Sequence, residues 1–262
     1  MLIRRCAVVC MVMVASPLLA RGPVPSCDIG GGDVVSIKQI TPQFELALDD
    51  GRVLKLPGLN PLFVRENATV AAITAELQAR AKTDVVLARE ISPLPDRWGR
   101  ILAQVAFVSQ SGEPEALAPI ILAQGGAMVK PEGEVAQCKD AYLAAEAQAR
   151  EQAKGLWGDG SFAIYPAAVP ETLEGLGGKF IIVEGKVTRY GEGQTRVFLD
   201  FGKRRGIDFS VTVLKKGLKA FARGGSDLYA LVGKTVRVRG TLDTRYGPRM
   251  ELFSPDAVEM VE

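Results

Sequence analysis

The window from Gly158 to Gly178 is the feature that most constrains how this chain folds. It holds two prolines and five glycines, which together argue against a regular helix or strand. The chain of 262 residues is long enough for a domain with its own core on each side of this window. We therefore expect two domains, at residues 33–159 and 179–262, joined by a linker at residues 160–178.

The first twenty residues have the layout of a secretory signal peptide. Two arginines precede an apolar run from Cys6 to Leu19, and Ala20 lies just before a possible cleavage point. The run is shorter than the about 20 residues that a membrane span requires. An uncleaved N-terminal anchor is the alternative, because Leu18 is a poor residue three positions before the cut. Residues 21–32 would form a flexible lead-in, and the mature chain would be periplasmic or secreted, with no membrane span.

Two cysteines, Cys27 and Cys138, lie outside that segment. In an exported protein an even pair favours one disulfide, which would stabilise the fold by about 4 kcal/mol in the chain-entropy model. Two buried free thiols are the alternative, since the sequence cannot place the Cβ atoms within bonding distance. A lipid on Cys27 is disfavoured by the residues Arg21–Pro25 that separate it from the apolar run, and zinc is disfavoured because the chain has no histidine.

Short β-favouring runs occur in both halves of the chain. Those of the first half are Val34–Ile40, Phe44–Leu48, Val53–Leu56, Val85–Ala88 and Ile101–Val108. Those of the second half are Phe180–Thr188, Thr195–Phe201, Ile207–Val213, Thr235–Thr241 and Pro248–Leu252. A mixed stretch with a possible short helix lies between the third and fourth of these. Three strands, a helix and two strands is the order of a barrel of the oligonucleotide-binding type.

Three helices are predicted in the first half. The first follows Asn67, which is suited to be its N-cap, and its apolar residues recur on one face. These residues are Val70, Ile73, Leu77 and Ala81. The second is predicted from Pro114 to Gln124, with Gly125 suited to end it. The third is predicted from Ala136 to Lys154, because that run is rich in alanine and other strong helix formers.

Two phrases of the first half carry a family resemblance. DRWGR spans Asp96–Arg100, and AEAQAREQAKGLW spans Ala145–Trp157. Both resemble landmarks of the staphylococcal-nuclease (thermonuclease-like) family, in which the first carries a catalytic arginine and the second is the closing helix. The resemblance covers about residues 33–159 and implies a small five-stranded barrel with three helices. GKTVRVRG at Gly233–Gly240 is similar to the fourth strand of many nucleic-acid-binding barrels. The fold class we expect is mainly β or α+β, a nuclease-like barrel followed by a second five-stranded barrel.

The resemblance implies a metal-dependent phosphodiesterase site, but most of its residues are replaced here. In the family they come from a DGDT turn, an R-x-x-x-x-D-T-P-E segment and the arginine of the DRWGR phrase. That arginine is intact as Arg100, and Lys55 takes the position of the other catalytic arginine. Gln43 and Asn60 take the positions of the metal-binding aspartates. An amide lacks the negative charge that binds a divalent ion, so no cofactor is expected, and Ca²⁺ only if the protein is a working nuclease.

The position of the general base is apolar. It falls on Leu62 or Phe63, depending on whether a gap is allowed. Loss of a general base costs about two to four orders of magnitude in rate. Glu66 could replace it only if a shift of three residues kept it within hydrogen-bond reach of the water. The absence of histidine also excludes Ser-His-Asp, Cys-His and histidine-metal catalysis.

The second half of the chain is basic and the first is acidic. Residues 176–262 carry 16 basic and 10 acidic residues, against 14 and 20 in residues 21–175. On barrels of this type, cations that follow the backbone and aromatics that stack on bases hold single-stranded nucleic acid. The candidate binding residues are Lys203, Arg204, Arg205, Arg237, Arg239, Arg245, Tyr246 and Arg249. The alternative is that these cations form ion pairs or that the basic face packs against the acidic half.

These observations favour an exported, nuclease-like protein with a decayed catalytic site that binds single-stranded nucleic acid or another polyanion. A Ca²⁺-dependent nuclease with a rearranged site is one alternative. A non-catalytic module that binds other proteins of the cell envelope is another.

Overall fold

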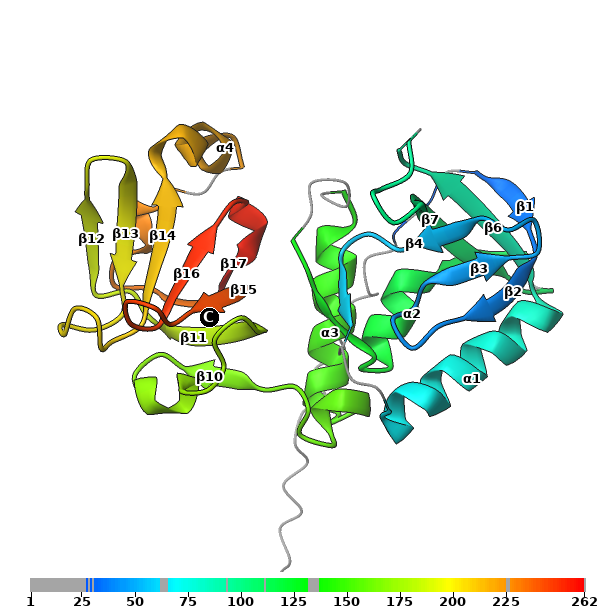
Figure 1. The fold of residues 1–262 in the computed structure, drawn as a ribbon, viewed down its shortest axis with the longest axis horizontal. Helices are drawn as coiled ribbons and strands as arrows, with labels where there is room; N and C mark the ends of the chain where they lie inside the picture. The colour runs from blue at the N-terminus through cyan, green and yellow to red at the C-terminus, as the bar shows by residue number, and fades with distance from the viewer. Residues whose placement is uncertain are drawn as a thin grey trace, which may run out of the picture.

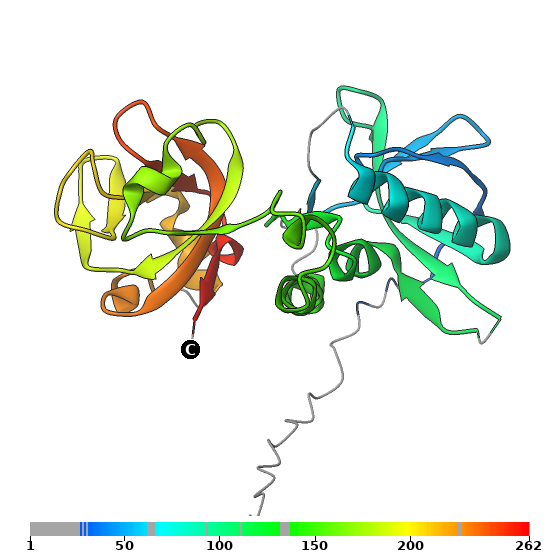
Figure 2. The same cartoon turned by 90° about the horizontal axis from the view of Figure 1, so that it is seen from below.

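The computed structural model describes residues 27, 29, 31–61, 66–92, 94–110, 112–131, 137–224 and 227–261. The chain forms two lobes, one for each half of the sequence, with α3 (Lys139–Glu151) on the side of the first lobe that faces the second (Figure 1, Figure 2). The predicted signal peptide at residues 1–20 lies outside the described residues and stays a prediction. In the described part of the chain, no helix has the length and apolar character needed to cross a membrane.

The first and last strands of the larger sheet in the N-terminal lobe follow one another in the chain. Its strands are β1 (Asp33–Val35), β2 (Ile37–Ile40), β3 (Leu46–Leu48), β4 (Val53–Lys55), β6 (Val85–Glu90), β7 (Arg100–Val108) and β8 (Pro114–Ala116). Their order is β1-β6-β7-β4-β3-β2, with β8 paired to β7. Only Ser36 separates β1 from β2, so the two ends of this path are one bent segment. The predicted barrel is therefore a partly open one.

The first helix matches the prediction and the other two differ from it. In α1 (Ala68–Thr83), the Asn67 side chain accepts a hydrogen bond from the Val70 N–H at 3.0 Å. Helix α2 (Leu117–Ala123) begins later than predicted, because Pro114–Ala116 pairs with the end of β7 instead. Helix α3 ends at Glu151, and Ala153 beyond it has a φ of 48°. The expected start of α3, Ala136, lies outside the described residues.

A second, small sheet and a disulfide complete the N-terminal lobe. Strand β5 (Leu59–Pro61) pairs antiparallel with β9 (Ala127–Val129). Cys27 and Cys138 form the predicted disulfide, with their Cα atoms 5.0 Å apart. The disulfide joins the segment before β1 to the residue that precedes α3, so it ties the start of the sheet to the closing helix.

The C-terminal lobe is built on a sheet of eight strands. They are β10 (Ile164–Pro166), β11 (Phe180–Lys186), β12 (Arg189–Glu192), β13 (Arg196–Asp200), β14 (Ser210–Leu214), β15 (Thr235–Asp243), β16 (Arg249–Leu252) and β17 (Val258–Met260). Their order is β10-β11-β15-β16-β14-β13-β12, with β17 paired to β15. Helix α4 (Leu218–Arg223) lies between β14 and β15 in the chain. Single 3₁₀ turns are η2 (Gly155–Trp157), η3 (Pro170–Leu173), η4 (Lys215–Gly217), η5 (Tyr229–Leu231) and η6 (Pro255–Ala257).

The segment expected to be a linker contains regular structure, which corrects the prediction. Strand β10 runs parallel to β11, and η3 follows it. Phe162 is 5% exposed and packs in the core of the N-terminal lobe. Proline and glycine disfavour long helices and strands. A three-residue edge strand and one docked aromatic ring are short enough to fit between the prolines and glycines of this segment.

The two large sheets have the same connectivity. Each begins with a bent first strand (β1 and β2, or β11 and β12), followed by a second and a third strand. A helix, α1 or α4, then precedes the fourth and fifth strands. In both lobes the third and fifth strands are parallel neighbours, β4 with β7 and β14 with β16. Equivalent loops of the two lobes can therefore be compared directly.

Candidate functional site

A cleft of about 240 Å³ opens on the N-terminal lobe, where the β2–β3 loop meets the end of β4 and the β6–β7 turn. The four motif positions identified from the sequence all line it: Gln43, Lys55, Asn60 and Arg100. The remaining lining residues are Phe44, Glu45, Leu56, Leu59, Pro61, Trp98 and Lys130. The fold thus brings together motif residues that lie up to 57 positions apart in the chain, from Gln43 to Arg100.

A strained loop holds one side of the cleft. Phe44 has a φ of 57° and is 1% exposed, and its N–H donates to the Thr41 carbonyl at 2.8 Å. Its ring fits against Gly126, where an added Cβ would lie 2.7 Å from a ring carbon. Burial of the ring offsets the cost of about 1–3 kcal/mol for this backbone conformation. The buried ring therefore fixes its neighbours Gln43 and Glu45 at the cleft.

Asp96 organises the turn that carries the motif arginine. Its Oδ1 accepts from the backbone N–H groups of Trp98 at 2.9 Å and Arg100 at 3.0 Å. Its Oδ2 accepts from Arg100 Nε at 2.9 Å and Nη2 at 2.7 Å. Hydrogen bonding to the Arg100 guanidinium lowers the pKa of Asp96 from 3.8 to about 2. Gly99, with a φ of 76°, completes the turn, so Arg100 is fixed as the first residue of β7.

Glu45 is the carboxylate of the cleft that the sequence motifs did not identify. The Nη1 of Arg100 donates to Glu45 Oε1, so each guanidinium nitrogen has a carboxylate acceptor. Hydrogen bonds to Asp96 and then to Glu45 raise the pKa of Arg100. No family motif marks position 45. The signal available was physical, because an arginine held on a strand requires acidic neighbours to satisfy its donors.

The rim of the cleft combines cations with an exposed aromatic ring. Trp98 is 63% exposed, and the guanidinium carbons of Arg97 and Arg100 lie 3.9 and 4.7 Å from its ring centroid. Lys130, which the sequence analysis missed because it lies beyond the motifs, lines the cleft with Lys55. Positive charge beside an exposed ring suits a phosphate group and a stacked base.

The oxygen donors of the cleft do not fit Ca²⁺. Calcium takes six to eight oxygen ligands, with carboxylates among them. Gln43 and Asn60 offer neutral amide oxygens, and Glu45 already accepts from the motif arginine. Among the described residues, no group of three or more His, Cys, Asp or Glu side chains could hold a metal ion. Glu66 does not line the cleft. The candidate positions of the base lie outside the described residues: Leu62 and Phe63.

The C-terminal lobe has a larger cleft, of about 600 Å³, beside the turn between β15 and β16. Five of the predicted binding residues line it: Lys203, Arg204, Arg205, Tyr246 and Arg249. Arg245 is not among its lining residues, and its side chain, 80% exposed, forms an ion pair with Asp243 at 3.0 Å. The structure thus gathers most of the predicted basic surface in one place.

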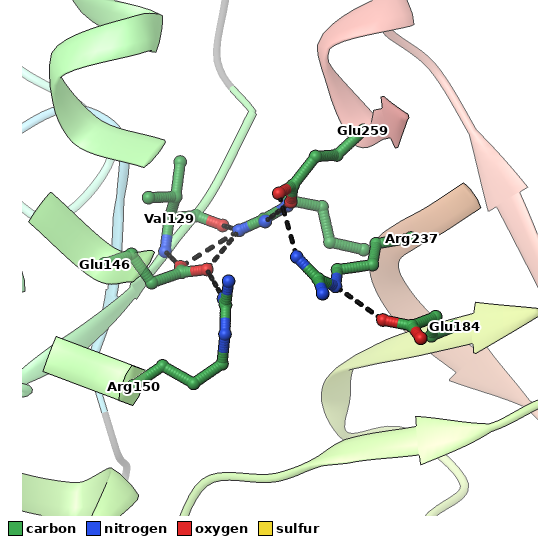
Figure 3. A network of polar contacts seen from close by, with 7 residues as sticks. Val129, Glu146, Arg150, Glu184, Arg237 and Glu259 are labelled. Carbon is green, nitrogen blue, oxygen red and sulfur yellow. Dashed lines mark hydrogen bonds and ion pairs between the residues drawn. The ribbon is translucent and has the colours of Figure 1, made fainter. Parts of the chain in front are cut away.

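Arg237 and Arg239 are the exception, and the prediction for them is corrected. They share one face of β15 as expected, but that face meets the N-terminal lobe (Figure 3). The Arg239 side chain is fully buried and its Nη1 donates to Glu146 Oε2 of α3 at 2.9 Å. Arg237 is 20% exposed and pairs with Glu184 at 2.7 Å and with Glu259 at 3.1 Å. Both open alternatives apply here, because Arg237 forms ion pairs within its own lobe and Arg239 packs against the acidic half.

Comparison with known proteins bears on the cleft of the N-terminal lobe. Residues 66–159 match the family model described as staphylococcal nuclease homologue. The chain therefore contains a domain of the staphylococcal nuclease family. The matched segment includes the turn at Asp96–Arg100, whereas Gln43, Lys55 and Asn60 precede it. No curated protein matches the chain.

Proposed function

We propose that the nuclease-like domain is a binding module whose cleft holds single-stranded nucleic acid and does not hydrolyse it through Ca²⁺. The oxygen donors of the cleft carry this proposal. Among the described residues, Glu45 is the one carboxylate that lines it, and both Glu45 and Asp96 accept from Arg100. A divalent cation would therefore meet mainly the neutral amides of Gln43 and Asn60, whereas Lys55 and Lys130 can contact a phosphate group. Trp98 beside these cations offers a surface on which a base can stack.

A salt-dependent binding measurement tests the proposal. We expect the full chain to retain a fluorescent oligothymidine, with an affinity that falls steeply as NaCl is raised. Lys55→Ala with Lys130→Ala should reduce the slope of log affinity against log salt by about 0.7 for each phosphate that the variant no longer neutralises. Trp98→Ala should cost about 1–3 kcal/mol if a base stacks on the ring. Lys82→Ala is the matched control, because Lys82 is exposed on α1 and does not line the cleft.

A Ca²⁺-dependent nuclease is the second candidate, favoured by the family match and by the intact Asp96–Arg100 turn. Incubation of single-stranded DNA with the full chain in Ca²⁺ and in EDTA separates the two. We expect intact DNA in both. Cleavage that requires Ca²⁺ and is lost in Arg100→Ala would establish the nuclease and refute the binding module.

We further propose that the protein acts in an oxidising compartment outside the cytoplasm. The disulfide Cys27–Cys138 supports this, since such bonds persist in secreted and periplasmic proteins. Cell fractionation with mass spectrometry should recover an oxidised chain that begins at Arg21. A reduced cytoplasmic chain that keeps residues 1–20 would be incompatible with export. Chemical cross-linking in the same fraction tests the third possibility, a partner protein of the envelope.

A further inference from the structure

The turn between β15 and β16 repeats the DRWGR turn of the N-terminal lobe. Asp96–Arg100 reads D-R-W-G-R, and Asp243–Arg249 reads D-T-R-Y-G-P-R. Both segments join the fourth strand of a lobe to its fifth, and in both the final arginine opens the fifth strand. The likeness is not visible without the fold, because two insertions interrupt the phrase and the flanking residues differ.

The aspartates of the two turns make two equivalent hydrogen bonds and differ in the others. Asp243 Oδ1 accepts from the backbone N–H two residues on, that of Arg245, at 3.0 Å, as Asp96 Oδ1 accepts from Trp98 at 2.9 Å. Asp243 Oδ2 accepts from Arg249 Nη2 at 2.9 Å, as Asp96 Oδ2 accepts from the motif arginine at 2.7 Å. Asp243 also accepts from Arg245 Nε and Nη2, whereas Asp96 also accepts from the Nε and the backbone N–H of Arg100. A hydrogen bond from the arginine at the strand start to the aspartate is thus present in both turns.

The aromatic residue and the glycine also correspond. Tyr246 is 77% exposed, and the guanidinium carbon of Arg249 lies 5.9 Å from its ring centroid. Gly247 has a φ of 91°, against 76° for Gly99. An added Cβ at Gly247 would lie 2.4 Å from the carbonyl oxygen of Gly206. This close approach packs the turn against the end of the basic loop that contains Lys203–Arg205.

The cleft beside this turn has cations that are not neutralised. Of the basic residues that line it, Arg204 pairs with Asp208 and Arg249 pairs with Asp243. Lys203 and Arg205 are exposed and form no ion pair within the described residues. Phe198 on β13 adds a second, half-buried ring to the lining.

We propose that this cleft is a second site for single-stranded nucleic acid, outside the segment that matches the nuclease family. Tyr246 stacks on a base, and Lys203 and Arg205 contact the backbone phosphates. Arg249, held by Asp243, positions the Tyr246 ring, as Arg100 does for Trp98 in the first lobe. The site rests on the proposed function and extends it to a second lobe, and the two clefts can be tested separately.

Stoichiometry with a short probe tests the second site. Calorimetric titration of the full chain with hexathymidylate, short enough to occupy one cleft, should give two bound molecules per chain. The second-lobe variant combines Lys203→Ala, Arg205→Ala and Tyr246→Ala. It should bind one molecule of hexathymidylate per chain. The affinity of this variant for a longer oligothymidine that reaches both clefts should fall by about 5- to 150-fold, the range expected when one base no longer stacks. The matched control is Lys216→Ala, Lys219→Ala and Tyr229→Ala, which removes two exposed lysines and an exposed tyrosine of the same lobe.

The outcomes separate the two clefts. If the variant at Lys203, Arg205 and Tyr246 binds with the stoichiometry and affinity of the control variant, the second site is refuted. The variant of the first cleft combines Lys55→Ala, Lys130→Ala and Trp98→Ala. If it leaves binding unchanged while the second-lobe variant abolishes binding, the function proposed for the first cleft fails and the second site stands. Absence of hexathymidylate binding by the unmodified chain overturns both. Circular dichroism and the melting temperature identify a variant that fails to fold, in which case Tyr246→Ala alone decides.

Discussion

Arg239→Ala tests how the two lobes are held together. Arg239 joins both, because its Nη1 donates to Glu146 Oε1 and Oε2 at 3.0 and 2.9 Å and to the Val129 carbonyl at 3.2 Å (Figure 3). Its Nη2 donates to Glu259 Oε2 at 2.9 Å. The side chains of Arg239 and Glu146 are 0% and 1% exposed. Water therefore cannot replace the guanidinium without opening the interface.

The structure sets the expected magnitude. After the substitution, the buried Glu146 carboxylate keeps the Val129 N–H at 2.5 Å and Arg150 at 3.6 Å. Removing one member of a buried pair costs about 3–5 kcal/mol, and because Arg150 still offsets part of the Glu146 charge, we expect the lower end of this range. This corresponds to roughly two to four orders of magnitude in the folding equilibrium. Arg52→Ala should cost only about 0.2–1 kcal/mol, because its pair with Asp50 is exposed.

Urea unfolding followed by tryptophan fluorescence measures the destabilisation. Trp157 is a suitable probe, since it lies in η2 next to α3 and Arg150 lies 5.8 Å from its ring centroid. The double variant Arg239→Met with Glu146→Leu removes both charges and should recover most of the stability. A decrease below about 1 kcal/mol for Arg239→Ala, or a double variant no more stable than the single one, would refute the view that this ion pair holds the lobes together.

Three further predictions concern stability. The double variant Cys27→Ser with Cys138→Ser removes a disulfide that spans a sequence separation of 111. It should lower the free energy of unfolding by about 4 kcal/mol. Wild type under reducing conditions should show the same decrease, which checks the prediction. The pKa of Asp96 is lowered from 3.8 to about 2, so its pairing with Arg100 stabilises the fold fully above pH 3.8, and the stabilisation is lost as the pH falls through about 2. NMR titration of the Asp96 carboxyl group should give this low pKa in wild type and a higher one in Arg100→Ala. A pKa that stays near 2 in Arg100→Ala would contradict the role of the pair. Gly125→Ala should lower the melting temperature more than Gly160→Ala does. Both residues have a positive φ, but only the Cβ at 125 would meet the Lys154 carbonyl oxygen, at 2.2 Å. Equal decreases in melting temperature would mean that backbone strain alone, at about 1–3 kcal/mol for each variant, accounts for the loss.

Local sequence patterns predicted the elements that depend on neighbours in the chain. Asn67 and the apolar residues that follow it defined α1, because capping and helical periodicity act over a few residues. The cysteine pair indicated the disulfide, and the DRWGR phrase led to the family and to Arg100. The expected strands were found, although the expected run Val34–Ile40 divides at Ser36 into β1 and β2. Six short strands were not expected: β5, β8, β9, β10, β12 and β17.

What the tertiary structure alone decided is which polar groups meet. Glu146 lies among the buried residues of α3 together with Ala145 and Ala149, and a carboxylate in that position requires a cation from elsewhere. The sequence contained this signal, but it could not show that the cation is Arg239, 93 residues away. For the same reason Glu45 and Lys130 joined the cleft without any motif to mark them.

The sequence by itself therefore determined the periodicity of each element, the pair of cysteines and the absence of carboxylates at the motif positions. The tertiary structure decided that β15 turns its two arginines toward α3, that Glu45 and Lys130 line the first cleft, and that two turns 147 residues apart share hydrogen bonds of the same kind. The physical reason is that periodicity shows which face of a strand or helix is apolar, whereas the partner of a polar face is set by long-range packing.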